Sequence, residues 1–253
     1  MRVIVREMEY GPCPYLEGRV WRVEEFSAPE FDPAVYESLL ASGWRRSGHS
    51  FYRSLCPGCE SCTPLRLDVR SFEPSRSQRR LLRLNADLAL ELLPPTFSEE
   101  RYDLYRRYLR FQHGERGEPS DEARASYSSF LLAGPFDTTA VAEYRDSGGR
   151  LLATGYVDIL PDGLSSVYFA FDPEAARRSL GTWSVLRETR LAAELGKRYY
   201  YLGFWVPGAA KMDYKANFTP FETASRGRWT LRGGRDEALA ELPAPDISAG
   251  GRP

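Results

Sequence analysis

The 253-residue sequence has no uncharged apolar run of the length that a membrane-spanning helix needs. Its first ten residues, MRVIVREMEY, also lack the continuous apolar stretch of a secretory signal peptide. We therefore expect a cytoplasmic protein that does not span a membrane. Disulfides are rare in that compartment, so the four cysteines are expected to be reduced thiols or metal ligands.

Histidine is scarce, with His49 and His113 as the two examples. Neither lies near a serine or cysteine nucleophile with an acid at a spacing that would suggest a catalytic triad. A hydrolase of that type therefore has little support, and both histidines are expected to be structural.

Lysine is absent from residues 45–85, although this segment holds nine arginines and three acidic residues. Its local charge is +6 in a chain whose formal net charge is −1. Guanidinium groups bind phosphate or carboxylate through paired hydrogen bonds, so we expect an anionic ligand near this segment. A charge run is by default a solvated surface, but the excess of one sign favours binding.

Several of these arginines are expected on one face of a helix that begins after Pro74-Ser75. Their three- and four-residue spacing places them together, while the intervening leucines can pack elsewhere. The positions are Arg76, Arg79, Arg80 and Arg83. The pattern predicts a positively charged ridge.

The cysteines Cys56, Cys59 and Cys62 form a Cys-x2-Cys-x2-Cys motif, and Cys13 can supply a fourth thiolate. Three thiolates within seven residues can converge on zinc or an iron–sulfur cluster. The two Cys-x2-Cys pairs of the usual structural zinc site are absent, so free, partly buried thiols are an equal alternative.

The arrangement of elements predicts an α/β (α+β) protein. We expect a small N-terminal domain over residues 1–93, a boundary at the proline pair after it, a second domain over 96–231 and a disordered tail over 232–253. In the second domain we expect strands over 139–144, 151–158, 164–171 and 199–205, with a helix over 182–195. This order is that of the GNAT acyltransferase core.

Further strands and helices are expected in the first hundred residues. Val3 and Val5 suggest an early strand before a turn at residues 11–14, and a second strand is expected over 20–26. Asp32-Pro33 is typical of a helix start, as is the segment beginning at Ser98.

Two later segments carry candidate chemistry. The turn that begins at Arg178 resembles half of the pyrophosphate-binding turn of acetyl-CoA-dependent enzymes, but its final small residue is missing. Residues 199–218, YYYLGFWVPGAAKMDYKANF, predict a buried strand followed by polar groups at its end, where α/β sites gather. These polar groups are Lys211, Asp213, Tyr214 and Lys215.

Together the motifs resemble the tRNA-dependent aminoacyl-protein transferases, a family with a bacterial aspartate/glutamate leucyltransferase branch and eukaryotic arginyltransferases. The matching runs are CPYLEGR (13–19), GWRRSG (43–48), YRSLCPGCESC (52–62), FEPSRSQRR (72–80) and YLGFWVPGAAKMDYK (201–215). The resemblance implies a cysteine-bearing N-terminal domain packed on a GNAT-like domain. Leu16 stands where the eukaryotic relatives have a further cysteine, which favours the bacterial branch.

The resemblance also implies a reaction. A leucyl group would pass from the 3′ end of leucyl-tRNA to the α-amine of a protein that begins with Asp or Glu, which marks that protein for N-end rule degradation. The donor is an activated ester, so no cofactor is required. The alternatives are arginine as the donor, acetyl-CoA-dependent N-acetylation on the same fold, and nucleic-acid binding without catalysis.

On this basis we assign roles as hypotheses. Acceptor or tRNA binding is placed on Arg46, Arg76, Arg79 and Arg80. We assign two possible roles, lining the reacting centre or donating to the oxyanion, to Tyr168, Tyr201, Lys211 and Tyr214. Asp213 is a candidate for proton handling.

Overall fold

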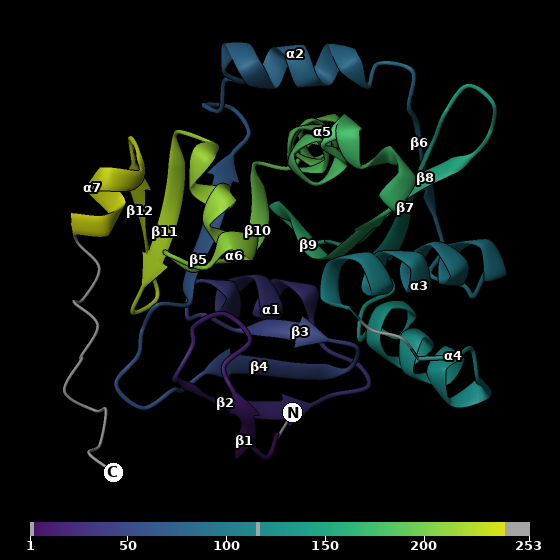
Figure 1. Cartoon of the computed structure of the whole chain (residues 1–253). Helices are drawn as coiled ribbons and strands as arrows, with labels where there is room; N and C mark the ends of the chain where they lie inside the picture. Colours follow the sequence, from purple (N-terminus) through teal and green to yellow (C-terminus); the bar gives the residue numbers. More distant parts are fainter. Residues whose placement is uncertain (1–2, 115–116, 241–253) are drawn as a thin grey trace.

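The computed structural model describes residues 3–114 and 117–240, which form two β-sheets with helices around them (Figure 1). The smaller sheet has the strand order β1-β2-β4-β3. Its strands are β1 (Arg6–Pro12), β2 (Val20–Ser27), β3 (Arg45–Ser47) and β4 (Ser50–Ser54). The predicted α/β class is confirmed. Among the described residues, no helix is both long and apolar enough to cross a membrane.

The larger sheet has eight strands in the order β12-β11-β5-β10-β9-β8-β7-β6. In chain order, the first four strands of this sheet are β5 (Thr63–Asp68), β6 (Ala89–Leu93), β7 (Thr139–Arg145) and β8 (Leu151–Ile159). The others are β9 (Gly163–Phe171), β10 (Tyr199–Trp205), β11 (Phe221–Ser225) and β12 (Arg228–Arg232). The predicted order of three strands, a helix and a strand is confirmed by β7, β8, β9, α5 (Leu180–Glu194) and β10.

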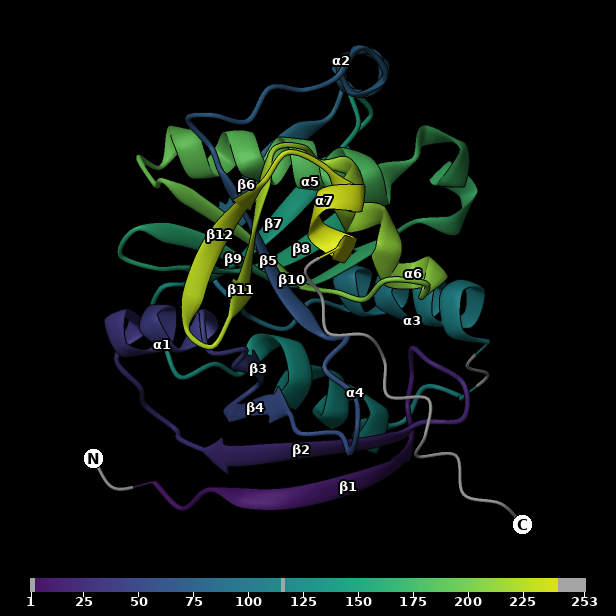
Figure 2. The ribbon, with the colours of Figure 1, turned by 90° about the vertical axis from the view of Figure 1, so that its left-hand side faces the viewer.

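The two faces of the larger sheet have different covers (Figures 1 and 2). Helix α5 packs on β9 and β10, and α2 (Arg76–Leu84) lies outside α5. Helix α3 (Glu99–His113) packs on β8 and β9. The remaining helices are α1 (Pro33–Leu40), α4 (Asp121–Tyr127), α6 (Ala210–Asp213) and α7 (Arg235–Ala240). Short π or 3-10 turns span Ser128–Leu132, Pro173–Arg178 and Tyr214–Asn217.

Two predicted helix starts are confirmed by their caps. The Asp32 side chain accepts a hydrogen bond from the Ala34 N–H, and Pro33 occupies the first position of α1. The Ser75 side chain and the Gln78 side chain form a reciprocal capping box at the start of α2. These local signals act within one turn of helix, so the sequence is sufficient to reveal them.

The predicted boundary near Pro94 does not separate the two sheets. Strands β5 and β6 both precede it, yet β5 lies in the interior of the larger sheet between β10 and β11. Leu65 and Leu67 of β5 are fully buried in the main core. The backbone hydrogen bonds of β5 are made with β10 and β11 from the later part of the chain, so residues before Pro94 contribute to both sheets.

Two predictions about the ends of the chain also differ from the structure. The first strand spans Arg6–Pro12, and Val3 and Val5 precede it. Residues 228–232 and 235–240 of the C-terminal region form β12 and α7, so order continues beyond the predicted start of the tail at 232. The rest of that predicted tail, residues 241–253, lies outside the described residues.

Candidate active site where two strands diverge

Strands β9 and β10 separate after a short parallel pairing. They pair only between Gly163–Ser165 and Tyr199–Tyr201. Each strand then carries one extra residue relative to its other neighbour, Val167 in β9 and Leu202 in β10. A cavity of about 340 Å³ opens at this point. Because both edges of the gap leave backbone groups unpaired by a sheet partner, the divergence creates a place for a ligand.

The wall of this cavity is rich in aromatic rings. Contributions come from the loop after β1, from α1, β4 and α3, and from the diverging strands, and the rings include Tyr15, Tyr36, Tyr52, Tyr108, Phe169, Phe171, Tyr200 and Phe204. Such a wall can stack on a planar base and enclose an aliphatic side chain. The first turns of α5 complete it through Gly181, Ser184 and Val185.

Several predicted site residues meet here. Tyr168, Lys211 and Tyr214 all line the cavity. Lys211 Nζ lies 3.3 Å from His113 Nδ1 at its exposed rim. Burial raises the pKa of Tyr214 to about 12, so its phenol stays protonated near neutral pH and can donate a hydrogen bond.

Two other predicted residues lie elsewhere. The Tyr201 hydroxyl donates to Glu37 Oε1 at 3.1 Å and packs in the core between the sheets. Its neighbour Tyr200 faces the cavity instead, because adjacent side chains of a strand point to opposite faces. Asp213 accepts hydrogen bonds from Trp205 Nε1 at 3.1 Å and from Arg235 at 2.7 Å, and it is not part of the cavity wall.

The predicted anion-binding residue Arg46 already has an anionic partner. Its Nε and one terminal nitrogen donate to the two carboxylate oxygens of Asp158 at 2.6 and 2.5 Å, and both side chains are fully buried. The pair joins β3 of the smaller sheet to β8 of the larger one. Arg46 touches the cavity wall, but its charge is neutralised within the protein.

The predicted arginine ridge lies on the outside of the molecule. Arg76, Arg79 and Arg80 are exposed on α2, and none of them lines the cavity. Helix α5 separates α2 from the diverging strands, as Figures 1 and 2 show. The ridge and the cavity are therefore separate features of the protein.

Two basic side chains to which the predictions assigned no role donate hydrogen bonds to backbone carbonyls at the divergence. Lys215 Nζ donates to the carbonyl oxygens of Leu202 at 2.7 Å and Phe204 at 3.0 Å. A terminal nitrogen of Arg45 donates to the Gly203 carbonyl between them at 3.1 Å. Both cations are buried and line the cavity. Burial, followed by repulsion from Arg45, lowers the pKa of Lys215 to about 7.

The sequence contained a signal that could have selected Lys215. The chain has three lysines, Lys197, Lys211 and Lys215, against many arginines. Retention of a lysine where arginine is the common cation indicates a site that uses the smaller, more readily deprotonated group. No comparable signal distinguishes Arg45 from Arg46, because the two are adjacent and chemically identical.

A buried carboxyl group lies behind the cavity wall. Glu188 of α5 accepts hydrogen bonds from the hydroxyls of Tyr200 at 2.6 Å and Tyr144 at 3.2 Å. Burial raises the pKa of Glu188 to about 7. Because its exposed fraction is 1% and it is absent from the wall, Glu188 orients Tyr200 from behind the cavity.

Gly203 has a backbone conformation that this arrangement requires. Its φ is +83°, and a β-carbon there would lie 3.5 Å from Lys215 Nζ. We expect Gly203→Ala to lower the free energy of unfolding by about 1–3 kcal/mol through left-handed backbone strain. Chemical denaturation is the measurement. Gly181→Ala is the matched control, because that position is helical and has open space around it. An equal effect of the two substitutions would contradict the assignment of strain to Gly203.

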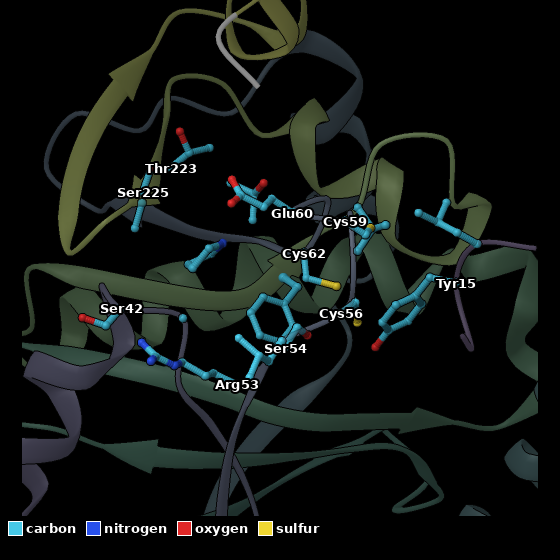
Figure 3. A pocket seen from close by; sticks show the side chains of 18 of the residues that line it. Tyr15, Ser42, Arg53, Ser54, Cys56, Cys59, Glu60, Cys62, Thr223 and Ser225 are labelled. Carbon is cyan, nitrogen blue, oxygen red and sulfur yellow. The ribbon is translucent and has the colours of Figure 1, made fainter. Parts of the chain in front are cut away.

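The four cysteines line a second cavity of about 280 Å³. Figure 3 labels three of them, Cys56, Cys59 and Cys62. Tyr15 and Phe204 are shared with the wall of the first cavity. Burial raises the pKa of Cys62 to about 11, which favours its neutral thiol. Within the described residues, no group of three or more histidine, cysteine or acidic side chains is placed to hold a metal ion.

Comparison with known proteins supports the resemblance noted in the sequence. The family model for the C terminus of arginine-tRNA-protein transferase matches residues 100–225, and that for the N terminus matches residues 11–80. A Nitrosococcus oceani aspartate/glutamate leucyltransferase is 41% identical over 87% of this chain and 92% of its own. One from Marinobacter nauticus is 42% identical over 86% of this chain and 91% of its own.

The similarity of this chain to a solved structure is evidence of its fold alone. The crystal structure of FemX matches with a TM-score of 0.52 at 9% identity, covering 94% of this chain and 89% of that one. Both family models match in chain order, and the related sequences match over most of their length. The chain therefore belongs to the arginine-tRNA-protein transferase family, with the bacterial aspartate/glutamate leucyltransferases among its relatives.

Proposed function

We propose that this protein transfers leucine from leucyl-tRNA to the α-amine of proteins that begin with Asp or Glu. The observation that carries the proposal is the aromatic cavity at the divergence of β9 and β10, in a chain whose curated relatives are named aspartate/glutamate leucyltransferase. The donor ester is already activated. The site therefore has to position two substrates, remove a proton from an ammonium group and stabilise an oxyanion.

The aromatic wall suits the donor end of the reaction. Base stacking on tyrosine and phenylalanine rings is favourable for any base, and the same rings can surround a leucine side chain. Tyr168 and Tyr214 carry the hydroxyls that we assign to the oxyanion. They come from two different elements, β9 and the turn after α6.

The acidic side chain of the acceptor requires a cation that is not already neutralised. Arg46 is paired with Asp158, whereas Arg45 forms no ion pair with a carboxylate of the described residues. Its hydrogen bonds go to the carbonyls of Leu40, Trp44 and Gly203, which leave its charge in place. We therefore assign attraction of the acceptor carboxylate to Arg45.

The ridge on α2 suits the tRNA backbone. Arg76, Arg79 and Arg80 are exposed, and within the described part of the chain none of them pairs with a carboxylate. Helix α2 packs on α5, whose first turns line the cavity. A duplex stem lying on the ridge would be held by phosphate contacts while its 3′ end reaches over α5 into the cavity. The reaction would take place in the cytoplasm, and its product would carry an N-terminal leucine as a signal for degradation.

Coenzyme A is disfavoured as a donor by the contacts of Arg178. Its Nε donates to Asn85 Oδ1 at 2.8 Å, and its guanidinium forms an ion pair with Asp87. These contacts tie the turn before α5 to the end of α2. A pyrophosphate group would have to displace both of them.

The test is a transfer assay with radiolabelled leucyl-tRNA or arginyl-tRNA and peptides that begin with Asp, Glu, Lys or Arg. We expect label from leucyl-tRNA on the peptides that begin with Asp and Glu. Label from arginyl-tRNA alone would identify the arginyltransferase activity instead. Acetylation of the same peptides by acetyl-CoA, without aminoacyl transfer, would overturn the proposal.

A further inference from the structure

We propose that Lys215 is the catalytic residue that accepts the proton of the acceptor's α-ammonium group, an inference that rests on the proposed aminoacyl transfer. Lys215 follows α6, at the point where β10 has left β9, and its amine lines the cavity. Two of its hydrogen-bonding directions are occupied by the Leu202 and Phe204 carbonyls. A neutral amine that donates both of its protons to carbonyls keeps its lone pair for a third direction.

The surroundings of Lys215 disfavour its charged form. Arg45 is the nearby permanent cation, and among the described residues Lys215 forms no ion pair with a carboxylate. Six phenols of the same wall have pKa values that burial raises, so they stay neutral near pH 7: Tyr15, Tyr36, Tyr52, Tyr108, Tyr200 and Tyr214. The wall also holds Tyr168 and, at its exposed rim, His113 and Lys211. Arg46 is neutralised by Asp158. A buried amine beside a cation and neutral phenols is therefore a base rather than a counter-ion.

Other candidate bases have contacts that do not suit this role. Asp213 is held by Trp205 and Arg235 outside the cavity. Glu188 lies behind Tyr200. Lys211 is exposed at the rim beside His113. Lys215 is the member of this set that is both buried and part of the wall.

The proton balance of the step is complete. Neutral Lys215 takes one proton from the ammonium group and becomes an ammonium ion. The freed amine uses its lone pair to form a bond to the ester carbonyl carbon, and the carbonyl electrons move to oxygen. When this oxyanion collapses, the carbon–oxygen bond to the tRNA ribose breaks, and the second nitrogen proton passes to the departing ribose oxygen. Lys215 then releases its proton to solvent.

The proximity of Lys215 to Arg45 also connects chemistry with acceptor choice. Both side chains donate to carbonyls of residues 202–204. A β-carbon at Gly203 would lie 3.5 Å from Lys215 Nζ and 4.0 Å from Arg45 Nε, so the two ends lie close together. In an acceptor that begins with Asp, the carboxylate and the α-ammonium group belong to the same residue. Attraction of the carboxylate to Arg45 would then place the ammonium group beside Lys215.

The experiment compares the wild-type enzyme with Lys215→Ala and Lys215→Arg, using leucyl-tRNA and an Asp-starting peptide. Arginine keeps the positive charge and the N–H donors but does not lose its proton near neutral pH. We expect both variants to lose kcat by about 100-fold or more. Wild-type kcat should rise with pH through about 7 as Lys215 loses its proton, and this rise should be absent in Lys215→Ala. Added methylamine should restore Lys215→Ala in proportion to its neutral form.

Controls separate a structural effect from a chemical one. Lys197→Ala removes the lysine that precedes β10 and donates to the Pro161 carbonyl, and it should leave kcat unchanged. If Lys215→Ala lowers the melting temperature, Lys215→Met, which keeps the volume of the buried stem, takes its place. High activity of Lys215→Arg, a rise in KM with unchanged kcat, or a folded alanine variant that amines do not restore would overturn the role. Absence of transfer by the wild type would instead refute the proposed function.

Discussion

Replacement of Asp158 by alanine is expected to lower the free energy of unfolding by about 3–5 kcal/mol, because it leaves the Arg46 guanidinium buried without an anion. Both side chains have no exposed surface, and both carboxylate oxygens of Asp158 accept hydrogen bonds from Arg46. Thr139 also donates to this carboxylate at 2.8 Å. The pair joins residues of the two sheets, so the loss should affect cooperative unfolding of the whole molecule.

Urea denaturation monitored by circular dichroism is the measurement for this prediction. Glu194→Ala is the matched control, because Glu194 is 43% exposed and pairs with Arg190 one turn away on α5. Such a pair contributes roughly 0.3–0.5 kcal/mol. Equal destabilisation by the two substitutions would show that the buried pair has no special weight. Replacement of both Arg46 and Asp158 by apolar residues should recover much of the loss, since no unpaired charge remains.

Removal of three arginines from α2 is expected to weaken tRNA binding by about tenfold or more without affecting folding. The change is Arg76→Ala with Arg79→Ala and Arg80→Ala. Their side chains are exposed, so stability should change little. Each lost phosphate contact should reduce the slope of log affinity against log salt concentration by about 1. Filter binding of leucyl-tRNA at several salt concentrations measures both effects.

A second triple variant controls for the loss of net charge in this experiment. Arg6→Ala, Arg190→Ala and Arg228→Ala remove the same charge from exposed positions on three other elements, β1, α5 and β12. We expect a smaller loss of affinity and a nearly unchanged salt slope. If the two triple variants bind tRNA equally well, the ridge has no specific part in tRNA binding, and its arginines are a solvated surface.

Features that depend on short segments of the sequence were predictable, whereas features that depend on distant contacts were not. Helices α1 and α2 begin where their caps predicted, because Asp32, Pro33 and the Ser75–Gln78 pair act within one turn. The GNAT-like order of β7, β8, β9, α5 and β10 was also predictable, since each element has its own periodicity. Helix α7 lies in the segment predicted as a tail, and β12 was not predicted as a strand although residues 228–231 fall within the predicted second domain.

The candidate site was predicted in part. Tyr168, Lys211 and Tyr214 reach the cavity, as expected from a cluster of polar and aromatic residues at a strand end. Tyr201 was chosen over Tyr200, and no sequence rule distinguishes two adjacent tyrosines until the face of the strand is known. The roles assigned to these residues remain predictions that the transfer assays can test.

By itself the sequence determined the family, most of the elements and their order, because motifs, caps and hydrophobic periodicity are properties of short segments. The tertiary structure alone decided which of the described basic side chains are paired with a carboxylate and which are not. Arg46 is neutralised by Asp158, 112 residues later in the chain, while its neighbour Arg45 and the distant Lys215 meet at the carbonyls of residues 202–204. Charge is a property of a residue, but whether that charge is free depends on which distant partners folding brings within hydrogen-bond distance.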